Sequence, residues 1–187
     1  MAEQRISGIS LRGIAAAVPR HREDNQESTA LDDKAQKEII ERVGIRFRHV
    51  ADPQTTAADL CQVSAENLLN ELDWNPTDVE LLVFVTQTPD YTVPGTATQL
   101  QHKLGLPQNA IALDLNQGCA GYVYGLSVAS AMMKSMGINR VLLLVGDTIT
   151  KMVSKADSSI APIFADAGSA TALELDDAGA EMVFRMG

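Results

Sequence analysis

The sequence has few cysteines, few aromatic residues and no long apolar run. Two cysteines in 187 residues are too few for a disulfide scaffold. No apolar stretch approaches the roughly 18 residues that a membrane-spanning helix needs, so we expect no membrane insertion. The opening residues, MAEQRISGIS, lack the apolar core of a secretory signal. The sequence therefore predicts a cytoplasmic protein.

Positive charge is also scarce. Lysine and arginine number 15 against 24 aspartates and glutamates, which gives a formal net charge of −9. This balance argues against binding to nucleic-acid phosphates. With 45% hydrophobic and 21% charged residues, the composition is globular, and the length favours one domain.

Strand and helix patterns alternate along the chain. The stretch 79–86 is nearly continuous in apolar and β-branched residues, which is typical of a strand buried on both faces. Similar strands at 111–115 and 141–146 alternate with helical segments at 96–104 and 120–136. We therefore predict a layered α/β/α fold with a mixed sheet. Its predicted strands are 5–17, 79–86, 111–115, 141–146 and 168–175.

Further helices and one outlying strand complete the prediction. A helix is expected over 28–43, ending at Gly44, and another over 55–72, capped by Thr56 with Asp59 three positions later. A short strand at 181–185 follows a turn at 176–179. Because the helix 120–136 has almost no polar face, we predict that it is the most buried element.

Cys119 is the strongest candidate for chemistry. It follows a predicted buried strand and a short polar turn, and it precedes an apolar helix. The unpaired N–H groups and the positive dipole end of such a helix stabilise a thiolate and a developing oxyanion. We expect Gly118 and Gly121 to leave room for a substrate. The alternative is an inert, packed cysteine, because free cysteines are often buried. One cysteine at a strand–helix turn is a modest signal, so this alternative is preferred when the turn is considered alone.

Several ordered segments together resemble the β-ketoacyl-acyl carrier protein synthase III family of the thiolase superfamily. They include the N-Q-G-C-A-G-Y nucleophile segment, an R-x-G-I-x-x-R-H segment and an F-A-D-A-G-S-A segment in which two family glycines are alanines. The resemblance covers nearly the whole chain. It makes a catalytic nucleophile, and not a packed cysteine, the preferred interpretation of Cys119. It implies that residues 1–187 form an N-terminal thiolase-like half-domain and that the C-terminal half is absent. The segments are 8–19, 42–49, 85–94, 116–126 and 164–170.

The resemblance implies a condensing acyltransferase of fatty-acid or secondary-metabolite synthesis. Cys119 would attack a short acyl-coenzyme A, which is a substrate and not a cofactor, and malonyl-acyl carrier protein would then react with the acyl-cysteine. The family's catalytic histidine and asparagine come from its second half. His21, His49 and His102 do not match that histidine. No metal site is expected, because Cys61 and Cys119 lack ligand spacing.

The resemblance also assigns binding residues. Arg42 matches an arginine that holds the nucleotide end of coenzyme A, and Lys151 stands where a second arginine contacts its phosphates. A lysine keeps the charge but not the bidentate fork, and Glu38 replaces a tryptophan that stacks on adenine. Ordinary surface charge is the alternative for both Arg42 and Lys151.

The family places an acyl-pocket residue that crosses a homodimer interface at Tyr91, Thr92 and Val93; the alternative there is a surface loop. For the whole chain, two other functions stay open. It could be a non-catalytic interaction subunit or fragment, or a thiolase-fold acyl transferase that loads acyl groups without condensing them.

Overall fold

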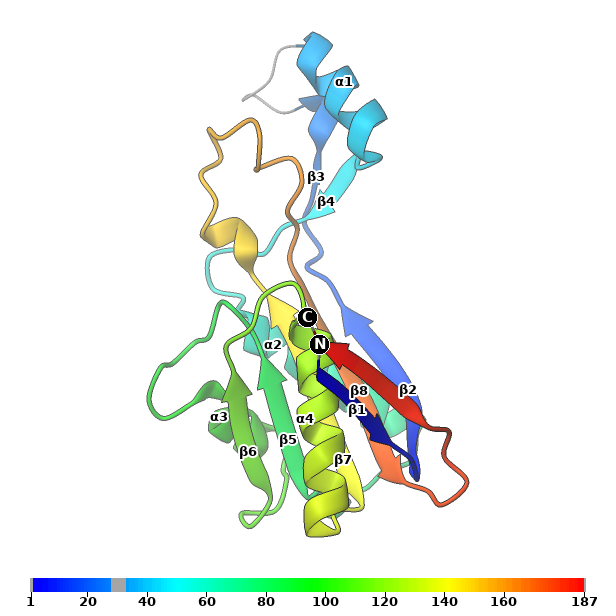
Figure 1. The fold of residues 1–187 in the computed structure, drawn as a ribbon. Coiled ribbons are helices and arrows are strands. Elements are labelled where there is room, and N and C mark those ends of the chain that lie inside the picture. Colours follow the sequence, from blue (N-terminus) through cyan, green and yellow to red (C-terminus); the bar gives the residue numbers. More distant parts are fainter. Residues whose placement is uncertain (1, 28–32, 187) are drawn as a thin grey trace.

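The computed structural model describes residues 2–27 and 33–186 and is built around a five-stranded sheet with strand order β2-β8-β7-β5-β6 (Figure 1). Strands β6, β5 and β7 run parallel, whereas β8 and β2 are antiparallel to their neighbours. The predicted mixed sheet is therefore confirmed. Its strands are β2 (Ile9–Ala17), β5 (Leu81–Val85), β6 (Ile111–Leu115), β7 (Arg140–Asp147) and β8 (Ala167–Leu175).

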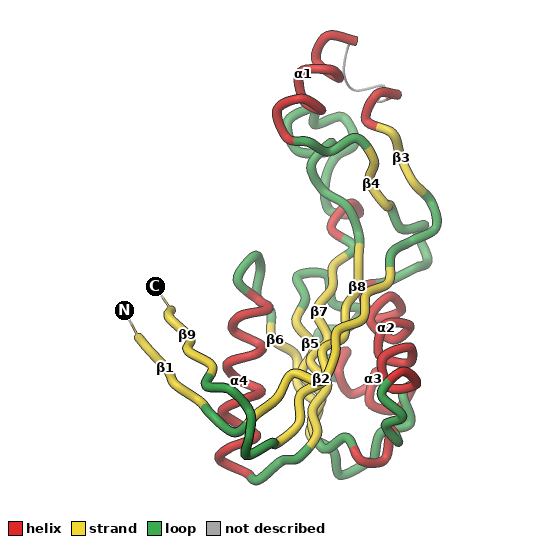
Figure 2. Tube along the Cα trace, turned by 90° about the vertical axis from the view of Figure 1, so that its right-hand side faces the viewer, coloured by secondary structure: helices red, strands yellow, loops and turns green. Residues whose placement is uncertain are grey.

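Helices cover both faces of this sheet. Figure 2 shows α4 on one face and α2 and α3 on the other. The predicted helices are confirmed, except that residues 28–32 of the first lie outside the described residues. The helices are α1 (Asp33–Val43), α2 (Ala57–Glu71), α3 (Thr96–Lys103) and α4 (Gly121–Met136), with short 3-10 turns at Asn25–Glu27, Pro76–Asp78 and Ile149–Lys151.

Strand β5 lies at the centre of the core. All five of its residues are buried. Leu82 and Phe84 belong to the apolar cluster beneath α2 and α3, whereas Leu81, Val83 and Val85 belong to the cluster beneath α4. The period of two in a strand accounts for this division, and it confirms a strand buried on both faces.

The prediction that the helix 120–136 is the most buried element is wrong, because β5 is more completely buried. Gly125, Ala129 and Met133 form a buried stripe along α4. Val123 and Tyr124, on other sides of the helix, are 45% and 37% exposed. An apolar composition all round the helix does not bury it, because the sheet covers only one stripe.

The prediction of one strand over 5–17 is also wrong. The chain breaks at Gly8, whose φ of 77° lies in the left-handed region that glycine tolerates best. The residues before it belong to β1 (Ala2–Ile6), which pairs antiparallel with β9 (Met182–Met186). This two-stranded sheet lies beside α4, on the side away from the main sheet (Figure 2). The strand predicted at 181–185 is thus confirmed as β9.

A small unit projects beyond the sheet (Figure 1). It consists of α1 and the antiparallel pair β3 (Arg22–Asp24) and β4 (Phe47–His49). Arg48 anchors it: the nearly buried guanidinium donates to Asn25 Oδ1 at 2.9 Å, to the Phe164 carbonyl at 2.9 Å and to Glu23 Oε2 at 2.7 Å. One arginine thereby ties β3, β4 and the segment before β8 together.

The predicted cap of α2 is present as a reciprocal capping box. The Asp59 N–H donates to Thr56 Oγ1 at 3.2 Å, and the Thr56 N–H donates to Asp59 Oδ2 at 3.0 Å. Among the described helices, none is long and apolar enough to cross a membrane.

Gly125 should resist substitution because α4 approaches the sheet closely there. An added Cβ would lie 2.7 Å from Leu143 Cδ1 and 2.8 Å from Val85 Cγ2. Overpacking of about 1–3 kcal/mol exceeds the roughly 1 kcal/mol that alanine adds to helix propensity. We expect Gly125→Ala to lower the free energy of unfolding by about 1 kcal/mol in urea titrations. Exposed Ser135→Ala, on the same helix, should change it by less than about 0.5 kcal/mol. A more stable Gly125→Ala variant would contradict the packing.

Candidate active site

Three polar segments meet at one edge of the sheet. Strands β5 and β6 end side by side, with Val85 paired to Leu115, and Val145 of β7 pairs with the other side of Val85. The loop 86–94, the turn 116–120 and the residues after β7 all leave the sheet at this edge (Figure 1). In open α/β sheets, ligands bind outside the carboxyl ends of parallel strands.

Cys119 lies in the turn 116–120 and is exposed. It immediately precedes Ala120, the cap residue of α4, which provides no side-chain cap for the helix. A backbone hydrogen bond of 2.7 Å from Gly121 N–H to the Gly118 carbonyl closes the turn around the cysteine. Cys119 thus precedes the first helical turn but stands at the positive end of the dipole of a 16-residue helix. The thiol is therefore not packed inside this chain.

The two glycines that flank the cysteine differ in role. A Cβ on Gly121 would lie 2.7 Å from Val85 Cγ1, so this buried glycine lets α4 rest on β5. The expectation that Gly121 leaves room for a substrate is therefore wrong. Gly118 is exposed, and the group beside it is the side chain of Gln87.

Asp147, at the end of β7, organises the start of the loop 86–94. Its Oδ1 accepts hydrogen bonds from Thr86 Oγ1 at 2.9 Å, from Gln87 N–H at 2.7 Å and from Thr88 N–H and Oγ1, both at 3.1 Å. Thr88 Oγ1 in turn accepts from the Thr148 N–H at 2.9 Å. Sequence reasoning missed Asp147. The available signal was a carboxylate at the end of a buried strand.

Asp90 anchors the same loop to α2. Its Oδ2 accepts from Thr56 Oγ1 at 3.0 Å, while its Oδ1 is buried without a hydrogen-bond partner in the described part of the chain. Burial raises the pKa of the Asp90 carboxyl, and the hydrogen bond from Thr56 opposes that rise. The loop is therefore held to β7 at its start and to α2 farther along.

The predicted pocket residues lie beyond this anchor. Tyr91, Thr92 and Val93 are all exposed, and Val93 is 87% exposed. They follow Asp90 and precede α3, so they lie on the outer part of the loop. Their surface position suits either a plain loop or a contact with another chain.

The predicted coenzyme A ligands stand apart from the cysteine. Arg42 is exposed in the last turn of α1, within the projecting unit (Figure 1). Lys151 Nζ donates to the Thr55 carbonyl at 2.6 Å and to the Pro53 carbonyl at 3.2 Å. This ammonium thus holds the segment before α2, a structural task that the charge pattern of the sequence did not reveal.

The three histidines lie elsewhere. His21 lies 3.8 Å from Glu23, in the projecting unit. The His49 Nδ1 is 2.7 Å from the Pro19 carbonyl. His102 lies in the last turn of α3, on the face of the sheet opposite α4 (Figure 2).

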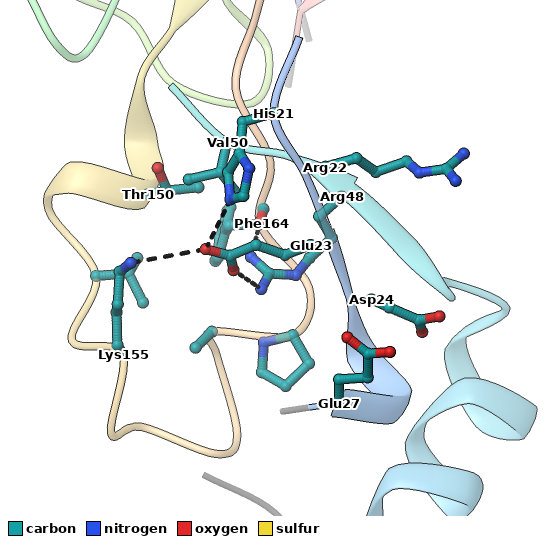
Figure 3. A pocket seen from close by; sticks show the side chains of 13 residues that line it. His21, Arg22, Glu23, Asp24, Glu27, Arg48, Val50, Thr150, Lys155 and Phe164 are labelled. Atoms are coloured by element: carbon teal, nitrogen blue, oxygen red, sulfur yellow. Dashed lines mark hydrogen bonds and ion pairs between the residues drawn. The ribbon is translucent and has the colours of Figure 1, made fainter. Parts of the chain in front are cut away.

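A cavity of about 350 Å³ opens between β3 and the segment 150–164 (Figure 3). Glu23 lies at its centre and contacts Arg48 at 2.7 Å, Lys155 at 3.6 Å and His21 at 3.8 Å. The charge of Glu23 is therefore balanced by its own neighbours. Neither Cys119 nor either predicted coenzyme A ligand lines this cavity.

Comparisons with known proteins agree with this geometry. Residues 113–186 match the family model described as 3-oxoacyl-[acyl-carrier-protein] synthase III. A putative 3-oxoacyl-[acyl-carrier-protein] synthase 3 of Campylobacter jejuni is 36% identical over 187 residues, which cover 98% of this chain and 52% of the relative. A β-ketoacyl-[acyl-carrier-protein] synthase III of Sphingopyxis alaskensis is 35% identical and covers 89% of this chain and 52% of its own.

Solved structures extend the likeness to the fold. A 3-oxoacyl-(acyl-carrier protein) synthase from Burkholderia xenovorans superposes with a TM-score of 0.94 at 39% identity, covering 97% of this chain and 52% of its own. The priming β-ketosynthase of the R1128 polyketide pathway gives a TM-score of 0.85 at 27% identity, covering 93% and 52%.

The layered sheet, with a cysteine turn at the carboxyl ends of its parallel strands, is thiolase-like. Within that class, the chain resembles the 3-oxoacyl-[acyl-carrier-protein] synthase III family: residues 113–186 match the family model, and the similar relatives carry that name. It spans about half the length of the curated relatives it matches. The resemblance recognised in the sequence is confirmed.

The two cysteines should differ sharply in reactivity. Cys119 is exposed, whereas burial raises the pKa of the Cys61 thiol to about 12. Because the thiolate is the nucleophile, Cys61 is almost entirely protonated near neutral pH. We expect iodoacetamide to alkylate Cys119 more than tenfold faster, as measured by peptide mapping over time. In denaturant the two rates should converge, and equal rates in the native protein would contradict the assignment.

Proposed function

We propose that the whole protein is a condensing acyltransferase of the 3-oxoacyl-[acyl-carrier-protein] synthase III type, acting in fatty-acid or secondary-metabolite biosynthesis in the cytoplasm. Cys119 carries the acyl group. The observation that carries this proposal is the exposed Cys119 at the N-terminus of α4, at the carboxyl ends of three parallel strands. The names of the relatives and of the structural neighbours support the same reaction.

In the first half-reaction, the Cys119 thiolate attacks the carbonyl carbon of an acyl-coenzyme A. A new carbon–sulfur bond forms, and the carbonyl electrons move to oxygen. Backbone N–H groups at the start of α4 stabilise this oxyanion. Collapse of the intermediate breaks the bond to the coenzyme A sulfur, which leaves and takes up a proton. The product is an acyl-cysteine.

In the second half-reaction, malonyl-acyl carrier protein loses carbon dioxide, and the electron pair of the broken carbon–carbon bond forms an enolate. The enolate carbon attacks the acyl-cysteine, which releases the Cys119 thiolate and a 3-oxoacyl product. The enolate needs charge stabilisation. We assign that task to a histidine and an asparagine of the second half that the family resemblance implies. Arg42 is proposed to hold the nucleotide end of coenzyme A, and Lys151, which also donates to two backbone carbonyls, is proposed to contact its phosphates.

Cys119 should become acylated in the whole protein. After incubation with acetyl-coenzyme A, mass spectrometry should find one acetyl group on the peptide that contains Cys119, and added malonyl-acyl carrier protein should then yield acetoacetyl product. Cys119→Ala should abolish both, whereas Cys61→Ala should keep both. Acylation without condensed product would indicate a non-condensing acyl transferase, and product formation by Cys119→Ala would refute the proposed nucleophile.

The 187-residue chain alone should be acylated slowly at best and should form no condensed product.

We also propose that the protein is a homodimer in which residues 86–96 and 111–124 supply much of the interface. The support is that, among the described strands, β6 ends the sheet and pairs with β5 alone. It carries one charged residue, and all its residues are half-buried. An edge strand left in solvent is usually blunted by charge or proline. The loop beside it exposes Tyr91 and Val93.

The dimer should weaken when a charge is placed on this surface. Sedimentation velocity of the whole protein at micromolar concentration should show a dimer, and Val93→Glu should shift it toward monomer. Because Val93 is 87% exposed, the substitution should not disturb the fold of one chain. Val63→Glu, at a 47% exposed position on α2, is the matched control and should remain dimeric. A monomeric parent protein would overturn the proposal.

A further inference from the structure

The side chain of Gln87 lies directly against the turn that carries Cys119. A Cβ built on Gly118 would be 3.2 Å from Gln87 Oε1, 3.3 Å from Cδ and 3.4 Å from Nε2. These nearly equal distances mean that the carboxamide turns its flat face toward the exposed Gly118, which precedes the cysteine. The amide is exposed, and within residues 2–27 and 33–186 it has no hydrogen-bond partner.

The backbone of Gln87 is firmly held even though its amide is unpaired. Its N–H donates to Asp147 Oδ1 at 2.7 Å, and the same oxygen accepts from the Thr88 N–H and from the buried Thr86 hydroxyl. The carboxylate makes these hydrogen bonds charge-assisted and therefore strong. The loop thus fixes the backbone that carries this carboxamide, and the hydrogen-bonding capacity of the amide is unused in the described part of the chain.

We propose that Gln87 is a substrate-contacting residue, whose Nε2 donates a hydrogen bond to the carbonyl oxygen of the acyl thioester that reacts with Cys119. Asp147 is its positioning residue. This inference rests on the proposed acyl transfer and adds a residue to that site. A neutral amide suits a thioester carbonyl because it supplies a donor without changing the charge beside the thiolate.

The contact predicts a selective loss of acylation. Gln87→Leu removes the amide but keeps a side chain of similar size. Because the variant loses one neutral hydrogen bond to the substrate, we expect the rate constant for acylation of Cys119 by acetyl-coenzyme A to fall about three- to tenfold. The reaction of Cys119 with methyl methanethiosulfonate, which has no thioester carbonyl, should stay within about twofold of the parent, because Gln87 acts on the carbonyl and not on the thiol.

The positioning role of Asp147 has its own signature. Asp147→Ala removes the acceptor for the Gln87 N–H and should slow acylation by a similar factor, whereas Asp147→Asn keeps an acceptor oxygen and should restore most of the rate. The double variant Asp147→Ala/Gln87→Leu should be acylated no more slowly than Gln87→Leu alone. Both substitutions abolish the same hydrogen bond, the one between Gln87 and the thioester carbonyl, so their effects should not add. Additive losses would overturn the positioning role.

Controls separate this inference from the proposed function. Gln62→Leu, on α2, removes an amide that donates to Glu66 and should acylate at the parent rate. If the parent whole protein is not acylated on Cys119, the proposed function fails. If the parent is acylated and Gln87→Leu matches it, acyl transfer stands and the role of Gln87 is refuted. Equal losses in acylation and in thiosulfonate reactivity would also refute it, because they would show a purely structural effect.

Discussion

The close approach of α4 to β5 is the constraint on which the site depends. Added Cβ atoms at Gly121 and Gly125 would lie 2.7 and 2.8 Å from the Val85 side chain, so only glycine lets the helix lie so near the strand. Because the helix axis is fixed at this depth, its N-terminus and the turn before it reach the carboxyl end of β5. A methyl group at either glycine would lift the helix and carry Cys119 away from the loop 86–94.

The Asp147 carboxylate provides the complementary constraint on the other wall of the site. One oxygen gathers the hydroxyl and N–H donors of residues 86–88, which leave the neighbouring strand. These hydrogen bonds delocalise its charge and reduce its repulsion of a nearby thiolate. Loss of one of these donors would leave the half-buried carboxylate less well paired and would destabilise the loop. The loop is consequently held by hydrogen bonds at residues 86–88, beside the turn that carries Cys119, and it is exposed at Val93.

The sequence predicted those elements whose signals come from residues close together in the chain. The apolar run around β5 and the Thr56–Asp59 cap identified their elements because neighbouring residues supply the signal. Contacts between distant residues escaped prediction. The pairing of β1 with β9, the role of Gly121 against Val85 and the bond of Asp147 to Gln87 join segments that are far apart in sequence. Lys151 shows the same limit, since its hydrogen bonds to the Pro53 and Thr55 carbonyls also join segments that are far apart in sequence.

The chemistry around Cys119 is suited to the first half-reaction. Residues 116–120 contain no ionisable group besides the thiol, and Gln87 beside them is neutral. A thiolate at a helix N-terminus needs no further charge to attack a thioester, because the dipole and the N–H groups already favour both the anion and the oxyanion. An enolate formed by decarboxylation develops its charge on the incoming malonyl group, farther from these donors. Its stabilisation requires donors that approach from outside this turn, so acyl loading and condensation should respond separately to changes in residues 86–94 and in the second half.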